Sequence, residues 1–128
     1  MSYTIDRLLE GVSMEEAEAR TRAALVDAKF GVLTEIDVKA TLKMKIDKDV
    51  PGYKILGACQ PMLASQMIEL EPTIGVLMPC NVVLREVEGG VEVSAMDPRG
   101  AMAPAANPEI ESILADGYER LAGAVANI

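Results

Sequence analysis

Four segments of the chain place apolar residues at helical spacing behind a residue that suits a helix start. Ser13-Met14-Glu15-Glu16 is a capping box, in which the Ser hydroxyl accepts from a free amide and the Glu reaches back. Asp37 and Asn107 can cap two further helices, and Pro61 suits a first helical position because its missing amide proton would be unpaired there. The pattern predicts helices over residues 13–29, 38–46 and 61–70, and one from residue 107 onward.

Between these helices lie short segments rich in β-branched and other apolar residues. They predict strands over residues 3–9, 31–36, 53–59, 74–87 and 91–96. Glu88-Gly89-Gly90 is typical of a hairpin turn between the last two strands. Pro79 interrupts the long fourth segment, and a proline inside a strand indicates an edge strand or a bulge. Residues 101–106, rich in Ala, Met and Pro, are predicted to form a loop crossing the surface.

The order of these elements predicts the fold class. Helices and strands alternate along most of the chain, which favours a sheet covered by helices, and the closing hairpin requires an antiparallel pair. We therefore expect a single two-layer α+β domain over residues 1–128, with a mixed or mainly antiparallel sheet of about five strands. A doubly wound parallel sheet is the second choice. The glycines form no phosphate-binding loop, since Gly57-Ala58-Cys59-Gln60 lacks the required spacing.

Charge and composition exclude several functions. The net charge of −8 disfavours nucleic-acid binding, and without a Lys/Arg cluster or a long apolar run we expect no membrane role. The segment from Met1 to Arg7 has no basic region followed by an apolar stretch, so we expect a cytoplasmic location with reduced cysteines. The chain has no histidine, which removes Ser-His-Asp and Cys-His catalysis and His-rich zinc sites.

Three segments carry a resemblance to a known family. They are Gly31-Val32-Leu33-Thr34-Glu35-Ile36-Asp37, Tyr53-Lys54-Ile55-Leu56-Gly57-Ala58-Cys59-Gln60-Pro61 and Leu77-Met78-Pro79-Cys80-Asn81-Val82-Val83. In this order they resemble the bacterial and archaeal domain-of-unknown-function family 302. The resemblance covers nearly the whole chain and implies a compact α+β fold and self-association, here as a homodimer. It implies no activity.

The two cysteines are the main candidates for chemistry. Cys59 ends a predicted strand just before the helix at Pro61, and the free amides of a helix N-terminus favour a thiolate. Cys80 follows Pro79, at the predicted irregularity of another strand, and bulges often re-aim a side chain at a functional site. If the two strands are neighbours, both sulfurs can share one pocket.

Three interpretations of this cysteine pair stay open at the level of sequence. Both residues can be small buried hydrophobes, which is common for free cysteine. They can bind a metal: copper with help from Met62, Met78 or Met96, or zinc with carboxylates such as Glu35 or Asp37. In the third interpretation, Cys59 is a reactive thiol and Cys80 its resolving partner in redox or sulfur-carrier chemistry.

Three polar residues are secondary candidates for ligand binding. Glu35 stands at a strand end, where it is a solvated charge or a group beside the cysteines, and Lys54 could pair with it. Asn81 carries an amide suited to fixing a ligand or bridging strands. The main hypothesis is a homodimeric ligand- or soft-metal-binding domain with its pocket around Cys59 and Cys80. A thiol enzyme or sulfur carrier, and a structural or interaction module without chemistry, are the alternatives.

Overall fold

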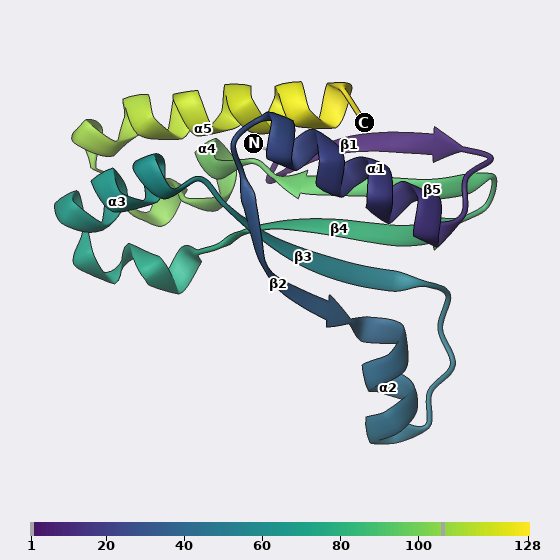
Figure 1. Cartoon of the computed structure of the whole chain (residues 1–128). Helices are drawn as coiled ribbons and strands as arrows, with labels where there is room; N and C mark the ends of the chain where they lie inside the picture. The colour runs from purple at the N-terminus through teal and green to yellow at the C-terminus, as the bar shows by residue number, and fades with distance from the viewer. Residues whose placement is uncertain (1, 106) are drawn as a thin grey trace.

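One antiparallel sheet of five strands organises the chain (Figure 1). The computed structural model describes residues 2–105 and 107–128. Two residues named in the sequence predictions lie outside the described residues: Met1 of the N-terminal segment and Ala106 of the predicted loop. The spatial order is β1-β5-β4-β3-β2, and every pairing is antiparallel. The strands are β1 (Thr4–Glu10), β2 (Gly31–Asp37), β3 (Tyr53–Cys59), β4 (Cys80–Val87) and β5 (Gly90–Met96). The α+β prediction is confirmed, and the parallel alternative is wrong.

The predicted helices all form, and the predicted cap side chains accept hydrogen bonds as expected. Side-chain oxygens of Ser13, Asp37 and Asn107 accept hydrogen bonds from backbone amides in the first turns that follow them. The return bond from the Ser13 amide to the Glu16 carboxylate, the second half of the predicted capping box, is not among the hydrogen bonds of the described residues. The helices are α1 (Met14–Asp27), α2 (Val38–Ile46), α3 (Pro61–Leu70), α4 (Pro98–Ala101) and α5 (Pro108–Ala126), with 3-10 turns η1 (Pro72–Leu77) and η2 (Ala103–Ala105).

The helices α1 and α5 lie together on one face of the sheet (Figure 1). Alternate residues of the strands point to that face and pack against the helices. The core they form includes Leu9, Leu56, Val82, Leu84, Val91, Val93, Leu25, Leu121 and Val125. Within residues 2–105 and 107–128, no helix covers the opposite face. There Leu8 stays 44 % exposed, and Asn81 and Arg85 are exposed too.

The predicted strand over residues 74–87 is wrong in its first half. Its N-terminal part forms η1, a cis peptide bond joins Met78 to Pro79, and β4 begins only at Cys80. Proline has no amide to donate to a ladder, so it stands just ahead of the strand. The expected edge or bulge at Pro79 is also wrong, because β4 lies in the middle of the sheet and the register shift falls between Val32 and Thr34 of β2.

The stretch after β5 differs from the predicted surface loop. Most of its described residues form α4 and η2, and Met102 is 0 % exposed. Met102 packs in a second core cluster with Met67, Ile74, Ile110 and Leu114, at the end of the sheet where α3, η1 and α5 meet. The apolar composition of this segment therefore serves the core.

Thr21 of α1 is the one described residue whose buried side chain has a polar atom without a hydrogen-bond partner. It is 1 % exposed. We expect Thr21→Val to raise the free energy of unfolding by about 1 kcal/mol, because an unpaired buried hydroxyl is costly. Valine keeps the β-branched shape. Urea denaturation measures the change, with Thr21→Ala as the control that opens a void and lowers stability. A destabilised valine variant would show that the hydroxyl has a partner in solution.

Candidate functional site

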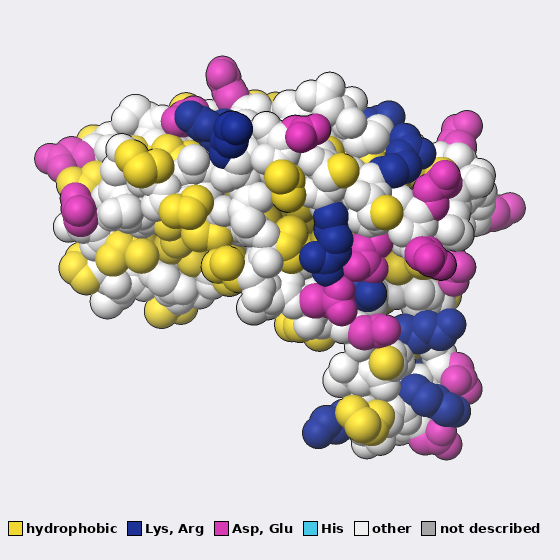
Figure 2. Space-filling model, viewed as in Figure 1, with side chains coloured by type: hydrophobic (Ala, Val, Ile, Leu, Met, Phe, Trp, Pro, Cys, Tyr) yellow, Lys and Arg dark blue, Asp and Glu magenta, His cyan; other side chains and the backbone are white. Residues whose placement is uncertain are grey.

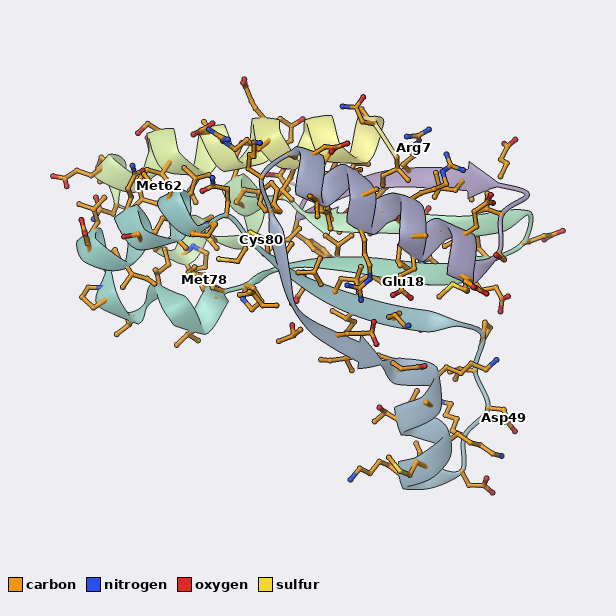
Figure 3. The ribbon with its side chains drawn as sticks, in the orientation of Figure 1. Arg7, Glu18, Asp49, Met62, Met78 and Cys80 are labelled. Atoms are coloured by element: carbon orange, nitrogen blue, oxygen red, sulfur yellow. The ribbon has the colours of Figure 1, made fainter. Side chains whose placement is uncertain are left out.

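A small, almost entirely apolar cavity lies where β3 ends, β4 begins, and α3 and α5 come together. Its volume is about 30 Å³, enough for one or two water-sized groups. The residues that line it are Phe30, Ala58, Cys59, Gln60, Leu63, Ala64, Met67, Met78, Pro79, Cys80, Pro98, Ile113, Leu114, Gly117 and Leu121. Figure 3 labels Met78, which lies ahead of β4, and Cys80, the first residue of β4, beside this region.

The pairing of β3 with β4 brings the two cysteines to this cavity. Ala58 stands directly opposite Cys80 in the antiparallel register, so Cys59 lies at the adjacent position. A shared pocket required the strands of the two cysteines to be neighbours. β3 and β4 are neighbours, and both cysteines line the same cavity. Both are free and partly buried, and they form no disulfide.

Two methionines bring the number of sulfur side chains around the cavity to four. Met78 was a sequence candidate and lines the cavity, as does Met67 of α3. Met62 is 68 % exposed and Met96 packs beside the second core cluster, and neither lines the cavity. Met67 was not among the residues predicted from the sequence, although its position one helical turn after Leu63 places the two on one side of α3.

The surroundings of the cavity hold Cys80 in its thiol form. Burial, and secondarily the neighbouring Cys59, raise the pKa of Cys80 to about 11. At the start of α3 the Gln60 side-chain oxygen accepts from the amide of Leu63 at 2.8 Å, so the only long polar side chain of the lining is used as a helix cap. The cavity therefore offers sulfur atoms and little else to a ligand.

We expect alkylation of Cys80 to be slow. In the wild type, a pKa of about 11 instead of 9.0 leaves Cys80 with roughly 100-fold less thiolate at about pH 8, and the thiolate is the reactive form. A Cys59→Ser variant isolates this thiol and keeps the effect of burial, which is the larger cause of the raised pKa. Iodoacetamide labelling followed by mass spectrometry measures the rate, and the same variant in denaturant is the control. Equal rates in the folded and the denatured protein would contradict the burial of this thiol.

The polar candidates Glu35 and Lys54 come together, but outside the cavity. The Lys54 ammonium lies 3.7 Å from the Glu35 carboxylate and 2.7 Å from that of Glu18 on α1, and Arg22 bridges both carboxylates. This cluster links α1 to β2 and β3, and Glu18 is labelled in Figure 3. None of its members lines the cavity.

Asn81 and Asp37 also lie away from the sulfur atoms. Asn81 is exposed and stands opposite Gly57 in the sheet register. Asp37 caps α2, accepting from the amide of Ala40 at 2.9 Å, as its position before a helix predicted. Neither Glu35 nor Asp37 lines the cavity, so the zinc site that would combine their carboxylates with the two cysteines does not form. Among the described residues, no group of three or more Cys, Asp or Glu is placed to hold a metal ion.

The ion pairs around Glu18 make stability depend on pH. Hydrogen bonding by Lys54, with help from Arg22 and against the effect of burial, holds the pKa of Glu18 below its ordinary value of 4.5. As the pH falls, the Glu18 carboxylate is therefore protonated in the unfolded chain before it is protonated in the folded protein. The stabilisation by the Glu18 ion pairs is complete above pH 4.5 and is lost as the pH falls through the lowered pKa of the folded protein.

Removing the lysine tests this. We expect Lys54→Met to lower the free energy of unfolding by about 1 kcal/mol at neutral pH and to flatten its decline below about pH 4.5. Urea denaturation between about pH 3 and 7 measures both effects. Lys39→Met is the matched control, since Lys39 has no ion pair among the described residues. A decline of unchanged steepness in Lys54→Met would assign the acid sensitivity to other carboxylates.

Together the fold and the cavity define a class: a small α+β domain with an antiparallel sheet, helices on one face, and a sulfur-lined cavity at the sheet end. Residues 6–128 match the family model described as "Domain of unknown function DUF302". The chain therefore belongs to this family, as its sequence resemblance indicated.

A solved relative supports the same fold. The crystal structure of an uncharacterized conserved DUF302 protein from Bacillus stearothermophilus is 26 % identical, superposes with a TM-score of 0.87, and the match covers 98 % of this chain and 95 % of that one. A comparison with curated proteins found no match. No helix in the described part of the chain has the length and apolar character needed to cross a membrane.

Proposed function

We propose that this domain binds a soft, monovalent, thiophilic metal ion of the Cu(I) type in the cavity between β3, β4 and α3. One observation carries the proposal: four sulfur side chains, those of Cys59, Met67, Met78 and Cys80, line a single small apolar cavity. Thiolates and thioethers are the ligands that Cu(I) prefers, and none of the residues that line the cavity carries the carboxylate that harder cations prefer.

The size of the cavity favours an ion over a larger ligand. Sites for drug-sized molecules and cofactors have volumes of roughly 300–1,000 Å³. The volume here is about 30 Å³. Zinc is disfavoured because structural zinc sites take four Cys, His or carboxylate ligands, and the cavity offers two cysteines.

The charge balance of the site is also suited to a monovalent ion. A thiol must lose its proton before it ligates, so binding releases protons. One thiolate with thioether and thiol neighbours gives a neutral complex with a monovalent cation, which an apolar cavity accommodates at the lowest desolvation cost. The raised pKa of Cys80 makes Cys59 the residue that we expect to supply this thiolate.

The thiol-enzyme alternative draws less support from the geometry. A resolving cysteine must present a thiolate, and burial raises the pKa of Cys80 to about 11. The cavity also brings no carboxylate or lysine beside either sulfur to act as a base. A reducing cytoplasm, proposed from the sequence, would keep both thiols available for metal.

We expect the purified protein to take up one Cu(I) per chain under anaerobic, reducing conditions, in competition with a chromogenic chelator. Cys59→Ser should abolish uptake, because it removes the expected thiolate. Met78→Leu should weaken uptake roughly tenfold because one soft ligand is lost at constant volume, and Cys80→Ser, which removes a protonated sulfur, should weaken it by a similar or smaller factor. Met62→Leu is the matched control, because this exposed methionine lies outside the cavity and its loss should leave affinity unchanged.

Other outcomes would contradict the proposal. Rapid alkylation of Cys59 below neutral pH together with no copper uptake would favour the thiol enzyme. Copper uptake that survives both cysteine substitutions would place the metal elsewhere on the chain. Two inert thiols without metal uptake would leave the cysteines as core residues.

A further inference from the structure

Gly117 is buried in the interior of helix α5 and is one of the residues that line the sulfur-lined cavity. In the interior of a helix, glycine is less favourable than any residue except proline, because it loses the most backbone freedom on folding. An isolated glycine inside a helix therefore has a reason in packing or in function. The surroundings of Gly117 decide between the two.

Packing does not require a glycine at this position. A Cβ atom added to Gly117 would lie 3.6 Å from Cγ of Pro98 and 3.8 Å from Cδ1 of Leu63, and both are ordinary van der Waals separations. Gly100 of α4 is different, because a Cβ atom there would collide with the backbone oxygen of Ser2. The backbone of Gly117 is helical, a conformation that alanine adopts more readily than glycine.

The missing side chain of Gly117 leaves a space at the cavity. Pro98 and Leu63, the two residues that an added methyl group would touch, also line the cavity. The volume of the cavity is about 30 Å³, so a methyl group is a large change to it. An empty apolar space lowers stability as well, because the side chains around it lose contacts. The chain therefore gives up stability at Gly117 both in helix propensity and in packing.

Surface charge offers little selection between cations at this end of the molecule. Figure 2 shows apolar side chains gathered over α3 and η1, where Met62 and Val76 are exposed. The lining of the cavity carries no carboxylate. Selection between cations must therefore come from the sulfur atoms and from the size of the space.

We propose that Gly117 is the specificity-determining residue of the proposed metal site. It keeps the position of one side chain vacant, so that a bare monovalent ion fits beside the sulfur atoms. The small volume that results excludes an ion that keeps its hydration shell or arrives bound to a small thiol. This inference rests on the proposed function and names the residue that makes room for the metal. The stability given up at Gly117 is the consequence of keeping this space open.

Copper uptake by a Gly117→Ala variant tests the inference. In the same chelator competition, the variant should bind Cu(I) at least tenfold more weakly than the wild type, because a methyl group fills space that the ion needs. Gly123→Ala is the matched control. Gly123 lies on the exposed side of the same helix, where an added Cβ atom meets nothing within 4 Å, and its variant should bind like the wild type. Adding Leu63→Val to Gly117→Ala shortens the side chain that faces the new methyl group and should restore uptake.

Two measurements on the metal-free protein separate a filled cavity from a damaged fold. Gly117→Ala should raise the Tm by about 3–5 °C, at least as much as Gly123→Ala, since both remove a helical glycine and only the first fills an apolar space. In pressure denaturation, Gly117→Ala should make the volume decrease on unfolding smaller, by on the order of 10 mL/mol, and Gly123→Ala should leave it unchanged.

The outcomes distinguish this inference from the proposed function. A wild type that takes up no copper overturns the proposed function, and the role of Gly117 in metal selection is overturned with it. If the wild type takes up copper and Gly117→Ala binds it equally well, the inference is wrong and the proposed function stands. A Gly117→Ala variant with a lower Tm than the wild type also overturns the inference, because packing would then require the glycine. A double variant that stays unable to bind copper would show that volume is not the cause.

Discussion

The antiparallel pairing of β3 with β4 is the constraint on which the rest of the structure depends. It sets Ala58 against Cys80 and Leu56 against Val82, and thereby decides which side chains enter the core and which meet at the sheet end. A slip of one residue would move every side chain of a strand to the other face. Because Leu56, Ala58 and Val82 are almost completely buried, the cost of such a slip in lost apolar burial is high.

The cavity follows from how the chain enters and leaves this pair of strands. Gln60 caps α3 directly after β3, and Pro79 keeps the preceding segment out of the ladder until β4 begins. Both transitions occur at the same end of the sheet, beside the second core cluster. Side chains from the ends of these strands therefore meet side chains of α3 and α5 there, and four of the residues that line the resulting cavity carry sulfur.

The two faces of the sheet differ in what covers them. The covered face, closed by α1 and α5, holds the core and supports the cavity. The open face carries a row of apolar residues, Ile36, Ile55 and Val83, across β2, β3 and β4. Beside β2, the helix α2 has no fully buried residue. The ion pairs of Lys54 with Glu18 and Glu35 stand at the border between these parts and fasten α1 to β2 and β3. The polar candidates Glu35 and Lys54 thus belong to the scaffold around β2, outside the cavity.

The sequence by itself determined the elements whose signals are local. Capping residues and helical spacing located α1, α2, α3 and α5, and the hairpin before β5 followed from its turn residues. The alternation of helices and strands was enough for the fold class. The family followed from three segments between Gly31 and Val83, and the family model matches residues 6–128.

Only the tertiary structure decided which distant side chains share a place. Met67 lines the cavity together with the cysteines, whereas Met62, Glu35 and Asn81 do not. Contact between distant residues depends on the register and twist of the sheet, which no local sequence pattern contains. The segment before Cys80 became a 3-10 turn, and Met102 entered the core, because packing at the sheet end outweighed the local preference of those residues. From the sequence, a pocket shared by Cys59 and Cys80 was a hypothesis. The register of β3 with β4 and the packing at the sheet end place both cysteines at a single apolar, sulfur-lined cavity.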